Sequence, residues 1–134
     1  MRFWFRGAAM AIVMACLAPP LAAHHSLRET HDISRTVTLA GVIARVDWAN
    51  PHAHIYLDVK GANGAIATWS IEIGAPNTMI RYGLGPSALK PNDQISVDVW
   101  IARDSALSAS AQSLKLSDGR TAHLAAPWAD QQNR

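Results

Sequence analysis

The stretch that decides the fold is HAHIYLDVKGANGAIATWSIEI, residues 52–73. Its centre, residues 61–64, is a Gly- and Asn-containing turn sequence between two β-type runs. Apolar residues alternate with polar ones on both sides of this turn, at Ile55, Leu57 and Val59 before it and at Trp69, Ile71 and Ile73 after it. Such a period of two is typical of strands with one buried face. The segment therefore predicts a β-hairpin, and matching its two apolar faces puts Glu72 across from His54.

Upstream of the hairpin, residues 36–48 form a long β-type run rich in Val, Ile and Thr. Val37 and Leu39 occupy one parity, whereas the later apolar residues Val42, Ala44, Val46 and Trp48 occupy the other. A change of parity is what one extra residue in a strand produces, so the pattern predicts a β-bulge at Gly41. Asn50-Pro51 predicts a turn into the hairpin.

Downstream of the hairpin, residues 74–92 lose the alternation. Pro76 favours a short helix that runs to about Tyr82. Residues 94–103 alternate again and predict a strand. Residues 105–111 are small and predict a loop, and Asp118-Gly119 predicts a last hairpin between residues 113–116 and 121–124.

The expected fold class is all-β. Three strands, a short helical connection and then further strands give the order of an OB-fold, a five-stranded Greek-key barrel. In this barrel the short helix lies between strands 3 and 4, and closure removes the open edges of so short a chain. We place this OB-like domain at residues 35–126, with an open β-sandwich as the alternative.

The first 23 residues have the three regions of a secretory signal peptide. Arg2 and Arg6 supply the positive charge, residues 7–18 are small and apolar, and residues 21–23 present small residues for cleavage. The apolar run is shorter than the ~20 residues of a membrane-spanning helix, so a retained anchor is the weaker alternative. We expect cleavage after Ala23, or one residue earlier, and a periplasmic or secreted product.

The expected mature chain has a polar arm, residues 24–34, before the β domain and a flexible tail, residues 127–134, after it. The whole chain has 12 basic and 10 acidic residues, and both arginines of the leader leave with it, so the mature chain has ten of each. A neutral chain without a basic surplus does not predict a nucleic-acid partner. The only cysteine, Cys16, lies in the leader, which excludes disulfides and thiolate chemistry in the mature domain.

Several stretches resemble a known family. These are His24-His25-Ser26, residues 38–42 (TLAGV), residues 48–52 (WANPH) and the strand around Trp69. They are similar to DUF 6152, a domain-of-unknown-function family of exported proteobacterial proteins, from residue 24 to about residue 124. The resemblance implies export and a compact β domain, and it implies no activity. The chain departs from the family pattern at His31, where an aromatic is expected, at Leu84, where a Trp is expected, and at Asn92, where a turn glycine is expected.

Histidines supply the main chemical signal. All six lie after residue 23, and five of them form two groups, one at His24, His25 and His31 and the other at His52 and His54. Cleavage after Ala23 would give His24 a free α-amine beside its imidazole, and histidine nitrogens favour Cu(II), Zn or Ni. The candidate metal ligands are therefore His24, His25, His52, His54 and Glu72, and nitrogen ligands without thiolates suit a transition metal such as Cu(II) or Zn. His31 and His123 are expected to be ordinary surface residues.

The sequence does not predict an enzyme, because it contains neither a Gly-x-Ser-x-Gly elbow nor a phosphate-binding loop. The functional hypothesis is a non-enzymatic binding domain that takes a transition metal through its histidines. The alternative is a protein- or small-ligand-binding module without metal that uses aromatic side chains and could take a periplasmic protein partner. For that module the candidates are Trp48, Tyr56 and Trp100, since OB barrels often bind ligands by stacking on aromatics.

Overall fold

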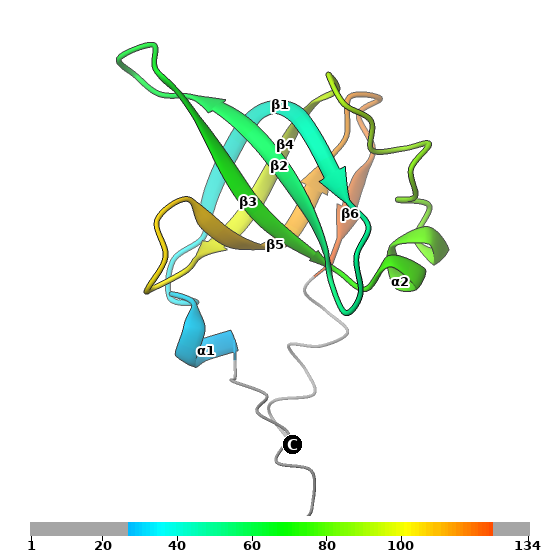
Figure 1. Ribbon diagram of the computed structural model, residues 1–134, viewed down its shortest axis with the longest axis horizontal. Helices are drawn as coiled ribbons and strands as arrows, with labels where there is room; N and C mark the ends of the chain where they lie inside the picture. The colour runs from blue at the N-terminus through cyan, green and yellow to red at the C-terminus, as the bar shows by residue number, and fades with distance from the viewer. Residues whose placement is uncertain (1–26, 125–134) are drawn as a thin grey trace, which may run out of the picture.

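The computed structural model describes residues 27–124, in which β-strands wrap into a barrel and helix is scarce (Figure 1). The predicted leader, most of the predicted arm before Leu27 and the predicted tail lie outside these residues. The elements in chain order are α1 (Leu27–Thr30), β1 (Val37–Asp47), β2 (Ala53–Lys60), β3 (Ile66–Gly74), α2 (Pro76–Arg81), β4 (Gln94–Ile101), β5 (Ser108–Lys115) and β6 (Thr121–His123). Within the described range, no helix is long and apolar enough to cross a membrane.

The barrel closes through a parallel pairing of β3 with β5. Antiparallel pairings join β3 to β2, β2 to β1, β1 to β4 and β4 to β5, and residues 70–72 of β3 then pair with residues 108–110 of β5. This ring of five strands, with α2 between β3 and β4, confirms the predicted OB-like barrel. An open sandwich is excluded because the two ends of the five-strand sheet are bonded to each other. The short β6 pairs with the far half of β5 and extends the sheet beyond the ring.

The core fills the barrel with aliphatic side chains from alternating positions. Strand β2 illustrates the pattern, since Ile55 and Leu57 are fully buried while His54 and Tyr56 are only partly covered. The fully enclosed members from the other strands include Ile43, Ile71, Val97, Val99 and Leu114. Two tryptophans, Trp48 and Trp69, are partly buried and pack against this cluster from its margin.

The predicted β-bulge in the first strand is wrong in position. Leu39, Gly41 and Ile43 keep one parity, and Ile43 is fully buried. The register shift against β2 falls between Ile43 and Arg45. The bulge therefore comes after Ile43 and not at Gly41. Ala44 is exposed as a result. The prediction placed the bulge at Gly41 because glycine is common in bulges. In the structure, Gly41 instead allows the backbone of β2 at Asp58 to approach closely.

The predicted loop over residues 105–111 is also wrong in part. β5 already begins at Ser108, and Ala109, Ser110 and Ala111 are all buried. Ala109 and Ser110 pair with both β3 and β4 in the closing seam, and Ala111 pairs with β4. A strand of Ala and Ser carries almost no hydrophobic alternation, so its burial could not be read from side-chain polarity.

The segment after α1 ties the arm to the end of β4. His31 forms an isolated antiparallel bridge with Ala102. The amide of Asp32 donates to the carbonyl of Ile101 at 2.9 Å, and the amide of Arg103 donates to the carbonyl of Thr30 at 2.9 Å. The described part of the predicted polar arm is therefore held against the barrel by backbone hydrogen bonds.

Candidate metal site

The candidate site begins with an ion-pair contact between His52 and Glu72. His52 lies just before β2, and Glu72 lies near the end of β3. The Nδ1 atom of His52 is 3.0 Å from Oε1 of Glu72, and the two side chains are 49% and 32% exposed. A carboxylate accepts a hydrogen bond from Nδ1–H, which leaves Nε2 of His52 as the nitrogen with a free lone pair.

His54 lies in the same region of the sheet, on the central strand β2, with an acidic residue across from it on each of the two flanking strands. It is the register partner of Glu72 on β3 and of Asp47 on β1. The predicted juxtaposition of Glu72 with His54 is thus confirmed. Because Ala53 and Ile55 on either side of it are fully buried, His54 projects to the outer face, where it is partly covered.

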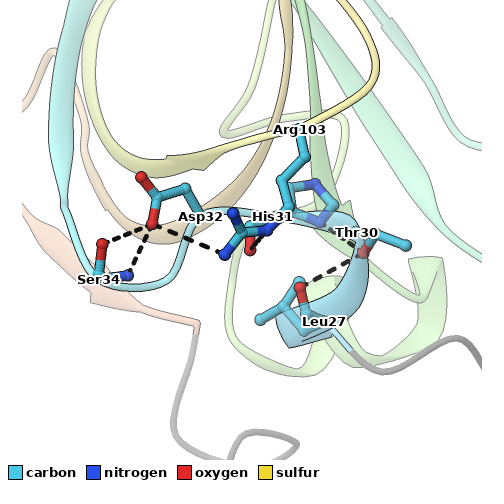
Figure 2. Close-up of polar contacts among 6 residues, drawn as sticks. All are labelled: Leu27, Thr30, His31, Asp32, Ser34 and Arg103. Atoms are coloured by element: carbon cyan, nitrogen blue, oxygen red, sulfur yellow. Dashed lines mark hydrogen bonds and ion pairs between the residues drawn. The ribbon is translucent and has the colours of Figure 1, made fainter.

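His31 reaches the surroundings of this site through the bound arm, which the sequence did not predict. Its Nδ1 atom is 2.8 Å from Oγ1 of Thr30 (Figure 2). Burial lowers the pKa of His31, and the negative charges of Glu72 and Asp104 raise it in part. The charge of Glu72 therefore reaches His31, in addition to the direct contact of Glu72 with His52. The expectation of an ordinary surface histidine is wrong for His31, whereas His123 is exposed as expected.

The structure brings together only part of the predicted ligand set. His52 and Glu72 are in contact, and His54 is the strand neighbour of Glu72. His24 and His25 lie outside the described residues. Within residues 27–124, no three His, Cys, Asp or Glu side chains are grouped closely enough to hold a metal ion. A complete coordination set at this position would need further donors.

Comparison with known proteins places the chain in a family without assigning it a chemistry. The profile of a family described as "Family of unknown function (DUF6152)" matches residues 11–111. The chain belongs to this family. No curated protein matches the chain, and no solved structure matches it either.

The DUF6152 match spans the barrel from β1 into β5 and ends before β6. It therefore includes all five predicted ligand positions, together with WANPH at residues 48–52, the stretch that carries the resemblance most specifically. In the structure these five residues lead into β2, and the last of them is His52. The family match assigns no role to any of these residues.

The aromatic candidates of this DUF6152 chain occupy different surroundings. The guanidinium of Arg45 on β1 lies 3.4 Å from the centroid of the Tyr56 ring on β2, a cation–π contact across the strand pair. One face of Tyr56 is thereby covered by the protein's own side chain. Trp48 packs against the core, and Trp100 is partly buried on β4. A ligand that stacks on Tyr56 would have to use the other face of the ring or displace Arg45.

Proposed function

We propose that this chain is an exported, non-enzymatic domain that binds a transition metal, with Cu(II) as the best candidate. The observation that carries the proposal is the 3.0 Å contact between His52 Nδ1 and Glu72 Oε1. Histidines that bind metals commonly donate the N–H of their other ring nitrogen to a carboxylate, which orients the ring and sets its tautomer. In this proposal Glu72 positions His52, and Nε2 of His52 is the ligand atom.

His54 is the second donor in the proposal. It is the register partner of Glu72 and comes two residues after His52 in the chain. Two imidazoles beside carboxylates, without cysteine, form a donor set of the kind that suits Cu(II) or Zn(II). Since no group of three donors exists among residues 27–124, the remaining ligands are assigned to the predicted new N-terminus, His24 and His25.

The tether supports this assignment. Leu27, at the start of α1, comes three positions after His24, and three residue steps of chain span at most about 11 Å. α1 in turn leads directly to His31, whose pKa is raised in part by the negative charge of Glu72. Cleavage after Ala23 would thus produce a free α-amine on a short tether from a segment that is bound near the candidate site.

The test compares Cu(II) binding by the protein that begins at His24 with binding by a form extended at its N-terminus. The processed form should bind more tightly by at least tenfold, since an extension converts the amine into an amide and removes a ligand. Binding should weaken as the pH falls, because protons compete with the metal for the imidazole and amine lone pairs. Titration calorimetry against a competing chelator measures both effects.

Variants separate the roles of the site residues. His52→Ala and His54→Ala together should abolish the site, and Glu72→Gln should weaken binding about 10- to 100-fold, as loss of a positioning carboxylate does. His123→Ala is the matched control, because His123 is exposed on β6 and is not paired with β2 or β3. Equal Cu(II) affinity in the processed, extended and His52→Ala/His54→Ala proteins would refute the proposal.

The alternative function, a binding module without metal, predicts different results. The protein should then bind no stoichiometric metal, the free N-terminus should have no effect, and Tyr56→Ala or Trp100→Ala should lose ligand or partner binding. The Arg45–Tyr56 contact favours this outer face as the place where such a module would act, because a cation and an aromatic ring are presented together there. The same set of variants therefore distinguishes the two functions.

A further inference from the structure

A second polar site forms where the arm meets the end of β4. Here the structure has an open pocket of about 320 Å³, and its lining residues are Asp32, Arg35, Ile101, Ala102 and Arg103. Two of the five carry guanidinium groups, and they come from positions 68 residues apart in the chain. The pocket exists because the backbone bonds between residues 30–32 and 101–103 hold the two segments together.

One guanidinium is oriented by the arm but keeps donors to spare. Nε of Arg103 donates to the carbonyl of His31 at 3.1 Å, which sets the direction of the side chain (Figure 2). Its Nη2 atom lies 3.9 Å from Oδ1 of Asp32, which is an ion pair but is too long for a hydrogen bond. The Nη groups of Arg103 are therefore available for an anion with better geometry.

Asp32 accepts its hydrogen bonds from Ser34, and its contact with Arg103 is a longer ion pair. Its Oδ1 accepts hydrogen bonds from the hydroxyl of Ser34 at 2.6 Å and from the amide of Ser34 at 3.1 Å. Figure 2 shows this carboxylate turned toward Ser34, with the longer contact to Arg103 on its other side. Arg35 forms no hydrogen bond or ion pair with any residue between 27 and 124. Two guanidiniums against one carboxylate leave one positive charge in excess.

We propose that this pocket binds a carboxylate. The planar donor edge of arginine matches a carboxylate in a two-bond arrangement, and Arg35 and Arg103 could each contribute one such edge. An excess of one positive charge suits a monoanion better than a dianion, and the side chains of Ile101 and Ala102 offer an apolar wall to the body of the ligand. The ligand class is a monocarboxylate with an apolar group next to it, supplied by a free small acid or by the carboxyl terminus of a polypeptide. The pocket shares no residue with the proposed metal site.

The experiment titrates the naturally processed protein with benzoate and follows binding by NMR. Benzoate should shift the Arg103 Nε resonance and the amide resonances of Arg35 and Ala102, while the neutral isostere benzamide should not. Arg35→Gln should weaken benzoate binding about tenfold or more, because a charged hydrogen-bonding partner is lost. Arg103→Lys keeps the charge but loses the planar edge, and should weaken it as well. Arg81→Gln on α2 is the matched control and should bind as the unaltered protein does.

Arg35→Gln keeps the test decisive even if Arg103→Lys loosens the arm, because Arg35 forms no hydrogen bond or ion pair that holds the arm within residues 27–124. An N-acetylated Ala-Phe dipeptide then identifies the source of the carboxylate. Tighter binding of the free-acid dipeptide than of benzoate supports a polypeptide terminus, and weaker binding supports a free small acid. Equal binding of benzoate and benzamide, or unchanged benzoate binding in Arg35→Gln, would overturn the proposal.

Discussion

At the scale of single residues, Gly41 shows how closely two strands of the barrel approach. A Cβ atom on Gly41 would overlap the carbonyl oxygen of Asp58 on β2 and would lie 3.1 Å from Cγ of Leu57. The obstacle is mainly backbone, which cannot rotate away as a side chain can. The position therefore requires the absence of a side chain, although its φ angle is an ordinary one.

Gly41→Ala should lower the free energy of unfolding by about 1–3 kcal/mol, the usual cost of forcing extra atoms into a packed region. Gly85→Ala is the control, since a Cβ there would meet only Cγ1 of Ile80 at 3.5 Å, an ordinary contact. It should change stability by less than about 0.5 kcal/mol. Urea unfolding of both variants measures the difference, and equal midpoints for the two would contradict the close-approach explanation.

Asp98 is the residue whose titration should be visible in stability. Its carboxylate on β4 accepts hydrogen bonds from Thr38 at 2.6 Å and from Ser113 at 2.8 Å. These two bonds lower the pKa of Asp98, and the nearby His123 adds to the effect. A carboxyl with a lowered folded-state pKa contributes stability above its unfolded pKa, near 3.9, and loses that contribution as the pH falls through the folded value.

Asp98→Asn should therefore be less stable than the unaltered protein at pH 7, by about 0.5–1 kcal/mol for this solvent-accessible group. The gap should narrow as the pH drops below about 4. Denaturant titrations at a series of pH values give the comparison. A gap that stays constant down to pH 2 would show that the carboxylate's charge is not what the hydroxyls stabilise.

At the scale of elements, the closing seam between β3 and β5 contains one unsatisfied group. Ser110 is fully buried, and its Oγ atom has no hydrogen-bond partner within the part of the chain that the structure describes. Its strand neighbours are Glu72 on β3 and Trp100 on β4. A buried hydroxyl without a partner costs free energy that an apolar group of similar size would not.

Ser110→Ala should raise the free energy of unfolding by about 1 kcal/mol, since it removes the unpartnered oxygen and leaves every described hydrogen bond intact. Ser113→Ala is the matched comparison, because it makes the same substitution three residues later on β5. It should lower stability, because the Ser113 hydroxyl donates to Asp98. Thermal unfolding of the pair tests this, and a large loss in Ser110→Ala would mean that its hydroxyl is bonded after all.

The elements also show which parts of the site a sequence can reveal. The hairpin of β2 and β3 was predictable down to the pairing of His54 with Glu72, because both strands alternate cleanly around a short turn. The contact of His52 with Glu72 was not predictable, since His52 precedes β2 and the register shifts between Ala53 and His54. Asn92 stands where the family pattern has a turn glycine. Its φ angle is 73°, a left-handed conformation that asparagine tolerates better than most residues do.

At the scale of the whole molecule, closure of the barrel decides which distant segments meet. β3 and β5 pair in parallel although the paired residues, such as Ser70 and Ser108, are 38 positions apart in the chain, and no local pattern encodes that pairing. Attachment of the arm to β4 likewise brings His31 under the influence of Glu72 and creates the pocket between Arg35 and Arg103. Both candidate sites therefore draw on segments that are remote in sequence.

The sequence by itself determined the strand periodicities, the turn positions around β2 and β3, the helix between β3 and β4 and hence the OB-like order, because these depend on contacts between near neighbours. It also predicts a secretory leader and marks histidines as the chemically notable residues. Only the tertiary structure decided where the first strand changes parity, that β5 starts at Ser108, that His52 forms an ion-pair contact with Glu72, and that two arginines share a pocket. These features depend on long-range packing and backbone pairing, which act between residues that the chain keeps far apart until it folds.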